Sequence, residues 1–257
     1  MGGTTCRRSL VAVLGAALVA ALAGCGGASH GRSASGLVSG TVAPTTLAPT
    51  TTTLERPRPY DPTKAIDLGG TPGVTAAEQK RAETLVRVTL ADLPKYADVA
   101  TAERDGYRTI GDALTGDEHF VKWSYVDDGH ILDPTRPESL VYEVRGGKKT
   151  LVAAMYMMPF GSRFTDVPDV GGALTQWHVH SDLCLTDNPE QKVLAGFTFG
   201  GQSCPAGTTK AGNTPMLHVW IVPNRCGPFA ALEGIGGGQI PPGQTRLCDT
   251  AHGLPTS

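Results

Sequence analysis

The stretch SLVYEVRGGKKTLVAAMYMM, residues 139–158, decides the class of the fold. Residues 139–145 and 150–158 are rich in strand-forming side chains, and Gly146-Gly147 between them is a two-residue turn signal. The second run is apolar on both faces, which predicts a strand in the middle of a sheet. We therefore expect an antiparallel hairpin at the centre of the folded part.

Elements on either side of the hairpin favour an α+β fold. Before it, Thr75-Ala76-Ala77-Glu78 is a capping box that begins a helix, Leu93-Pro94 ends that helix, and a second short helix is expected over residues 95–104. After it, further strands are expected at residues 176–180, 193–199 and 216–222. Helices first and strands later predict a short N-terminal helical segment followed by a mainly antiparallel β domain, either a sandwich or a barrel.

The N-terminus has the order of an export signal. Arg7 and Arg8 precede an apolar stretch over residues 10–24, which is too short to cross a bilayer comfortably and suits a signal-peptide core. It ends in Leu22-Ala23-Gly24-Cys25, which resembles the lipobox of bacterial lipoproteins. The resemblance implies that residues 1–24 are removed and that Cys25 is lipidated, with palmitate among its acyl chains. An ordinary secretory peptide is the alternative, and the arginine pair also fits twin-arginine export.

Composition divides the rest of the chain into two parts. Residues 25–70 are dominated by Ser, Gly, Ala, Thr and Pro, which predicts a flexible tether below the lipid. Residues 71–257 are expected to form a single globular domain. The net charge is -2 and the chain has no run of Lys or Arg, so it lacks the basic patch that is typical of nucleic-acid-binding proteins. The expected location is the outer face of the cell membrane, with the membrane, an envelope protein or a small-molecule ligand as partner.

Cysteine usage agrees with export. Cys6 leaves with the signal peptide and Cys25 takes the lipid, so four remain: Cys184, Cys204, Cys226 and Cys248. An even number in an oxidising compartment predicts two disulfides that brace the domain. Of the three connectivities, 184–204 with 226–248 closes the shortest loops and is our preference. A thiolate metal site is the alternative, but the chain has no C-x-x-C pair.

Four histidines are the candidate metal ligands of this sequence. Trp177-His178-Val179-His180 places two imidazoles on the same side of a strand, and Met216-Leu217-His218-Val219-Trp220 carries a third on another apolar strand. His119, between Glu118 and Phe120, is a candidate fourth ligand. Imidazoles in this number suit Zn, Cu, Fe or Ni with an open coordination position.

Two other interpretations of these residues stay open. Histidines on apolar strands also serve as hydrogen-bonded core residues, without any metal. Met155, Met157 and Met158 on one strand, and Met216 near His218, offer thioethers that favour Cu(I) or simply fill the core.

Two family resemblances bear on the same residues. Gly172-x5-His178-x-His180 resembles the start of the first cupin motif, which implies metal-binding histidines on a small β-barrel; Cys184 and Leu185 stand where that motif has its Glu. Segments at 95–107, 119–121, 132–143 and 217–230 resemble a family of uncharacterised secreted bacterial proteins. That second resemblance implies one continuous domain in which His119 and His218 are motif members.

These observations together predict a cell-envelope lipoprotein with a divalent-metal-binding site of His178, His180, His218 and His119. The pattern does not choose between catalysis and storage. The alternative is a non-catalytic binding or structural lipoprotein of the envelope that holds no metal.

Overall fold

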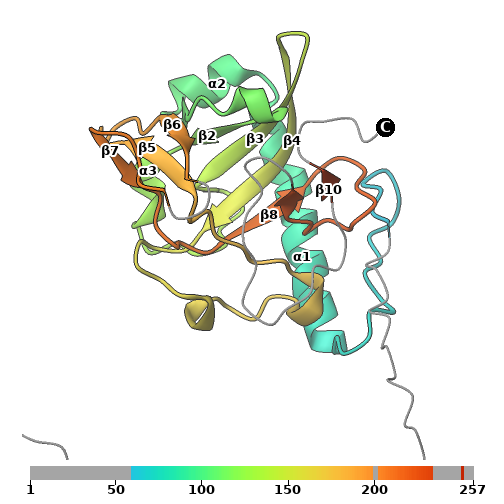
Figure 1. Cartoon of the computed structure of the whole chain (residues 1–257). Helices are drawn as coiled ribbons and strands as arrows, with labels where there is room; N and C mark the ends of the chain where they lie inside the picture. Colours follow the sequence, from blue (N-terminus) through green and yellow to red (C-terminus); the bar gives the residue numbers. More distant parts are fainter. Residues whose placement is uncertain (1–58, 199–201, 234–249, 252–257) are drawn as a thin grey trace, which may run out of the picture. The chain divides into compact units, whose positions relative to one another are not determined.

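The computed structural model describes residues 59–198, 202–233 and 250–251 (Figure 1). The predicted signal peptide, Cys25, most of the predicted tether and Cys248 lie outside the described residues. The α-helices are α1 (Ala76–Asp92), α2 (Val99–Arg104) and α3 (Trp123–Val126). The 3₁₀ helices are η1 (Leu93–Tyr96), η2 (Ala113–Thr115), η3 (Phe164–Asp166) and η4 (Gly172–Leu174). The strands are β1 (Arg108–Thr109), β2 (Asp117–Val121), β3 (Ser139–Arg145), β4 (Lys148–Met157), β5 (Leu183–Thr186), β6 (Leu194–Phe197), β7 (Thr208–Lys210), β8 (Met216–Trp220), β9 (Leu232–Glu233) and β10 (Thr250–Ala251).

The predicted hairpin lies inside a five-stranded antiparallel sheet with the order β1-β2-β3-β4-β8. Gly146 and Gly147 connect β3 to β4 with φ angles of 57° and 79°. Two positive φ values in a row suit the tight turn whose twist matches the flanking strands, and glycine adopts them without strain. Because β4 pairs with both β3 and β8, it is an interior strand, as its apolar sequence predicted.

One face of this sheet packs against α1. The helix buries Ala82, Leu85 and Val86 in a cluster that includes Tyr156 and Leu217 from the sheet. The hydroxyls of Thr89 and Tyr156 are 2.7 Å apart inside this layer, so the buried tyrosine keeps a hydrogen-bond partner. Helix and sheet together form the α+β arrangement that the sequence predicted.

The helix boundaries follow the local signals. The side chains of Thr75 and Glu78 each accept the other residue's backbone N–H, so the capping box is confirmed. The α-helix ends at Asp92, and Leu93-Pro94 continue as η1, because Pro94 cannot supply the next helical N–H. The second helix is shorter than the predicted 95–104 and begins at Val99.

A three-stranded sheet with the order β6-β5-β7 lies on the other side of the five-stranded sheet. Cys184 of β5 is bonded to Cys204, which confirms the preferred first pair. Cys226 is also disulfide-bonded, and its predicted partner Cys248 falls outside the described ranges. The described strands form open, sandwich-like sheets and no closed barrel, so the sandwich is the alternative that fits.

Other features also differ from the sequence predictions. Residues 176–180 form no strand; the backbone makes a bridge in which His178 and Met216 exchange hydrogen bonds of 3.0 and 2.8 Å. The strand β2 was not predicted, because the charged pair at 117–118 hides its alternation. Packing also begins before residue 71: Tyr60 pairs with Asn224, and Leu68 is buried in the main core. The end of the predicted tether therefore belongs with the folded part.

No helix within residues 59–198, 202–233 and 250–251 is long and apolar enough to cross a membrane.

Replacement of Cys184 and Cys204 together by alanine tests the brace on the small sheet. The bond spans a sequence separation of 20. A loop of that size restricts the unfolded chain enough to stabilise the folded state by about 3 kcal/mol. We expect the double variant to lose about that much free energy of unfolding in urea titrations. An unchanged midpoint of urea unfolding would show that the disulfide does not stabilise the folded state.

Glu138 is the most deeply buried carboxyl group in the described core, with 1% of its surface exposed. Its Oε2 accepts the backbone N–H of Met157 at 3.0 Å. Burial raises the pKa of Glu138 from 4.5 to about 8, and the hydrogen bond from Met157 only partly opposes this. The folded protein thus keeps a proton on Glu138 at pH values where the unfolded chain has lost it.

This proton makes stability depend on pH. Between pH 4.5 and about 8 the folded state binds more protons than the unfolded state, so the free energy of unfolding falls as pH rises. We expect Glu138→Gln to remove a pH-dependent loss on the order of 3 kcal/mol across this window. Urea unfolding at pH 5 and pH 8 measures it, with the exposed Glu190→Gln as the matched control. Equal pH slopes in the wild type and Glu138→Gln would contradict the assignment.

Candidate functional site

Four buried histidines lie in one row on the face of the sheet opposite α1. His119 comes from β2 and His218 from β8, while His178 and His180 lie on the segment that bridges to β8. Their side chains are nearly inaccessible, with 0% exposure for His178 and His218 and 5–6% for the other two. Neighbouring ring centroids are 5.6 Å apart for His119–His218, 4.9 Å for His178–His218 and 5.3 Å for His178–His180. The structure thus brings together all four histidines that the sequence singled out.

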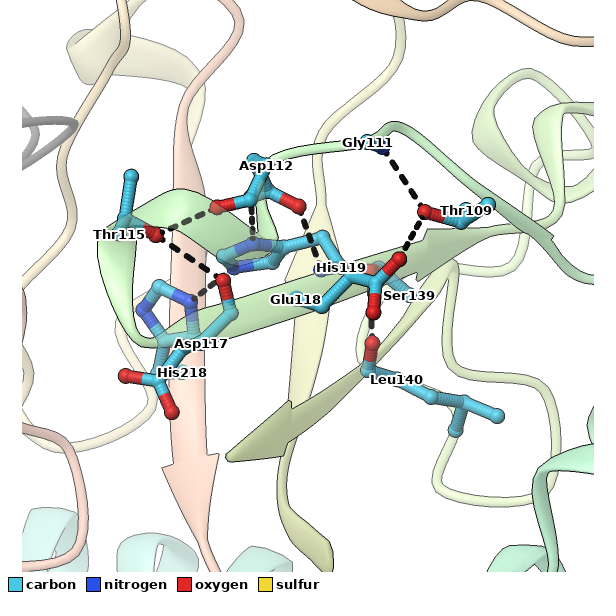
Figure 2. Close-up of polar contacts among 10 residues, drawn as sticks. All are labelled: Thr109, Gly111, Asp112, Thr115, Asp117, Glu118, His119, Ser139, Leu140 and His218. Atoms are coloured by element: carbon cyan, nitrogen blue, oxygen red, sulfur yellow. Dashed lines mark hydrogen bonds and ion pairs between the residues drawn. The ribbon is translucent and has the colours of Figure 1, made fainter. Parts of the chain in front are cut away.

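Asp112 holds one end of the row (Figure 2). Its Oδ1 accepts the backbone N–H of His119 at 2.9 Å, and its Oδ2 lies 2.6 Å from Nδ1 of the same residue. The turn at Gly116, with a φ of 97°, folds the chain back so that Asp112 and His119 meet. A carboxylate on Nδ1 fixes the ring orientation and leaves Nε2 for a second interaction, as in many metal-binding histidines.

Acidic groups give this end of the row a negative environment. Burial alone would lower the pKa of His119, but the charge and hydrogen bond of Asp112 outweigh it, and the pKa is raised. Asp117 and Glu118 add to the same effect. Burial also raises the pKa of Asp117 to about 6, with His119 acting in the opposite direction. The site is therefore arranged to favour a positive charge near His119, whether a proton or a cation.

The decisive distance joins Nε2 of His119 to Nε2 of His218, which are 3.3 Å apart. In the metal-free protein this separation fits a hydrogen bond in which one ring donates to the other. The same separation fits two ligands of one metal: two nitrogens about 2.0–2.1 Å from a tetrahedral ion lie roughly 3.3–3.4 Å apart. One proton or one cation can therefore occupy the space between these two rings.

His178 is held differently. Its Nδ1 lies 3.2 Å from the backbone carbonyl oxygen of Gln176, which can only accept, so Nδ1 is the protonated nitrogen and the neutral ring has its lone pair on Nε2. The ring stacks on His218 with an angle of 14° between the planes. Lone pairs of parallel stacked rings run side by side and do not meet at one point. Accordingly, within the part of the chain that the structure describes, no group of three His, Cys, Asp or Glu side chains is placed to hold a metal ion.

A cavity of about 170 Å³ leads to the histidine row from the surface. Its buried end is lined by Asp112, His119 and His180, whereas its outer end includes exposed Lys210 and Phe160. Between these ends, the five-stranded and three-stranded sheets supply mostly apolar walls. The row of imidazoles is thus reachable by a small molecule although the rings themselves are almost completely buried.

Sequence reasoning missed one component of the site, Asp112. Asp112 was not singled out, because the turn that brings it to His119 has no strong signal in the residues between them. Met155, Met157 and Met216 were considered as ligands or core residues, and the structure places all three on the cavity wall. His130, with an exposed side chain beside Asp128, lies outside the row.

A comparison of the chain with protein-family models, curated proteins and solved structures found no match. The resemblances to cupins and to a secreted family therefore remain predictions, and the functional argument depends on the geometry of the site.

Proposed function

We propose that the protein is a cell-envelope lipoprotein that binds a divalent transition metal through His119 and His218, with His178 or His180 as a further ligand. The observation that carries this proposal is the Nε2–Nε2 distance of 3.3 Å between two buried imidazoles. It matches the spacing of two nitrogens on one tetrahedral ion. Zn, Cu, Fe and Ni are the ions that imidazole ligands suit.

The surroundings of His119 support a ligand role over a purely structural one. A hydrogen-bonded core histidine needs one or two neutral partners, whereas His119 has a carboxylate on Nδ1 and a second imidazole at Nε2. Asp112 would make the ring a stronger ligand, and the nearby Asp117 favours positive charge. Metal binding replaces the proton between the rings, so no negative group is left without compensation.

A third imidazole requires a side-chain rotation. The stacked ring of His178 would have to leave its parallel arrangement on His218, or His180 would have to turn toward the pair. The ring of His178 already lies beside His218, with centroids 4.9 Å apart, and His180 lies next to His178. The remaining position would face the cavity and could accept water or a small ligand.

The envelope part of the proposal rests on the N-terminal pattern and on the disulfide. Basic residues, an apolar core and Leu22-Ala23-Gly24-Cys25 occur in the order of a lipoprotein signal. Disulfides persist in oxidising compartments and are rare in the cytosol, so the bond between Cys184 and Cys204 favours export.

Elemental mass spectrometry of the full chain, purified after export and titrated with Zn, Cu, Fe and Ni salts, tests the metal site. We expect near-stoichiometric binding of at least one ion. His119→Gln and His218→Gln should each weaken it at least tenfold, and Asp112→Asn should weaken it about 10–100-fold, as for other groups that orient a ligand.

His130→Gln is the matched control, because this imidazole also faces an aspartate but lies on the surface. It should leave metal affinity unchanged. Far-UV circular dichroism of every variant separates loss of ligands from loss of fold. If the wild-type protein folds but binds none of the four metals, the result would support the structural alternative, in which the four histidines are only core residues.

Detergent phase partitioning and intact mass measurement test the anchor. We expect the mature chain to begin at an acylated Cys25 and to enter the detergent phase, because two or more acyl chains hold a protein stably on a bilayer. Cys25→Ser should shift the protein to the aqueous phase, whereas Cys6→Ser, within the predicted signal peptide, should not. An unmodified N-terminus elsewhere in the chain would refute lipidation.

A further inference from the structure

We propose that the cavity beside the histidine row binds a neutral phenol, a single aromatic ring whose hydroxyl group points toward Asp112. This goes beyond metal binding, because the cavity and its walls exist in the metal-free protein. The argument uses the size of the cavity, the chemistry of its walls and the charge at its buried end.

The size fits one ring. The cavity has a volume of about 170 Å³. An engineered protein cavity of about 150 Å³ with apolar walls binds benzene. A single ring with one or two small substituents therefore fills this space.

The walls favour an aromatic ring over an aliphatic one. Trp123 and Phe160 stack with their ring centroids 6.4 Å apart and an angle of 17° between the planes, and Phe197 adds a third aromatic side chain. Lys192 places its ammonium 5.4 and 5.3 Å from the Trp123 and Phe160 centroids, which holds this wall in position.

Another part of the lining is rich in sulfur. Met155, Met157 and Met216 come from neighbouring strands β4 and β8 and all line the cavity. Thioethers make favourable contacts with aromatic rings and adapt their shape to a ligand. Aromatic side chains and thioethers in the same lining together suit a flat π system as the ligand.

The buried end selects a hydroxyl group over a carboxylate. Asp112 can accept a hydrogen bond from a neutral hydroxyl, because its two oxygens offer about four acceptor sites and His119 occupies one on each oxygen. Asp112 lies at the same end and faces the cavity. A carboxylate ligand would bring a second negative charge beside it in a poorly solvated space, which is unfavourable. Benzoate should therefore bind more weakly than phenol.

Titration of the chelator-treated full chain with phenol, benzoate and cyclohexanol, followed by NMR, tests this inference. We expect phenol to bind with a Kd of about 1 mM or tighter, which is within reach of a seven-atom ligand. Benzoate and cyclohexanol should bind at least fivefold more weakly. Phenol ring protons should show nuclear Overhauser effects to the Met155 or Met157 methyl group.

Two pairs of variants locate the binding. Ala211→Phe fills the cavity and should abolish phenol binding, whereas Ala211→Ser keeps the space and should retain it. Phe160→Ala removes half of the stacked pair and should weaken binding at least fivefold. Ile131→Ala is its control, because both side chains are exposed apolar groups (42% and 49%) and Ile131 lies outside the cavity. Since Phe160 is half exposed, its variant should fold even where Ala211→Phe does not.

The result separates this inference from the proposed function. Phenol binding in the metal-free protein supports the inference even if no metal binds. The inference is overturned if phenol binds neither the chelator-treated nor the zinc-treated protein, whatever the metal titration shows. Equal affinity for phenol and cyclohexanol, or binding that survives Ala211→Phe in a folded protein, also overturns it.

Discussion

Backbone pairing of β4 with β8 is the constraint on which the rest of the structure depends. Its register sets Met155 opposite His218 and Tyr156 opposite Leu217. Because side chains alternate along a strand, His218 faces the side of the sheet that carries His119, while Leu217 faces α1. A slip of one residue would turn the imidazole into the apolar helix layer and the leucine into the histidine row. Fold and site are therefore set by the same ladder of hydrogen bonds.

Four imidazoles buried side by side are costly unless their polar atoms find partners. The Asp112 carboxylate lies beside Nδ1 of His119, and the Nε2 atoms of His119 and His218 are 3.3 Å apart. The backbone carbonyl of Gln176 accepts a hydrogen bond from Nδ1 of His178. These contacts hold the rings in a row, with the Asp112 carboxylate at its His119 end. An arrangement of this kind can keep a proton in the absence of metal and a cation in its presence, with little change in the surrounding charge.

The second sheet is what turns the histidine row into a site. Without β5, β6 and β7, the face of the large sheet that carries His119 would have no opposite wall, and the cavity would not exist. The Cys184–Cys204 bond joins β5 to the segment before β7 and so braces that wall. A metal bound through His119 and a ring bound in the cavity, as proposed above, would share this enclosure.

Local patterns in the chain were enough to predict the capping box at Thr75, the hairpin around Gly146-Gly147, the disulfide at Cys184 and the grouping of His178, His180 and His218. Each depends on residues near in sequence or on a side-chain period, and such signals survive without tertiary context. The partnership of Asp112 with His119, the stacking of His178 on His218 and the cavity between the sheets could not be predicted in this way. They depend on the strand register and on the distance between two sheets, which long-range packing sets and which no short segment of the chain encodes.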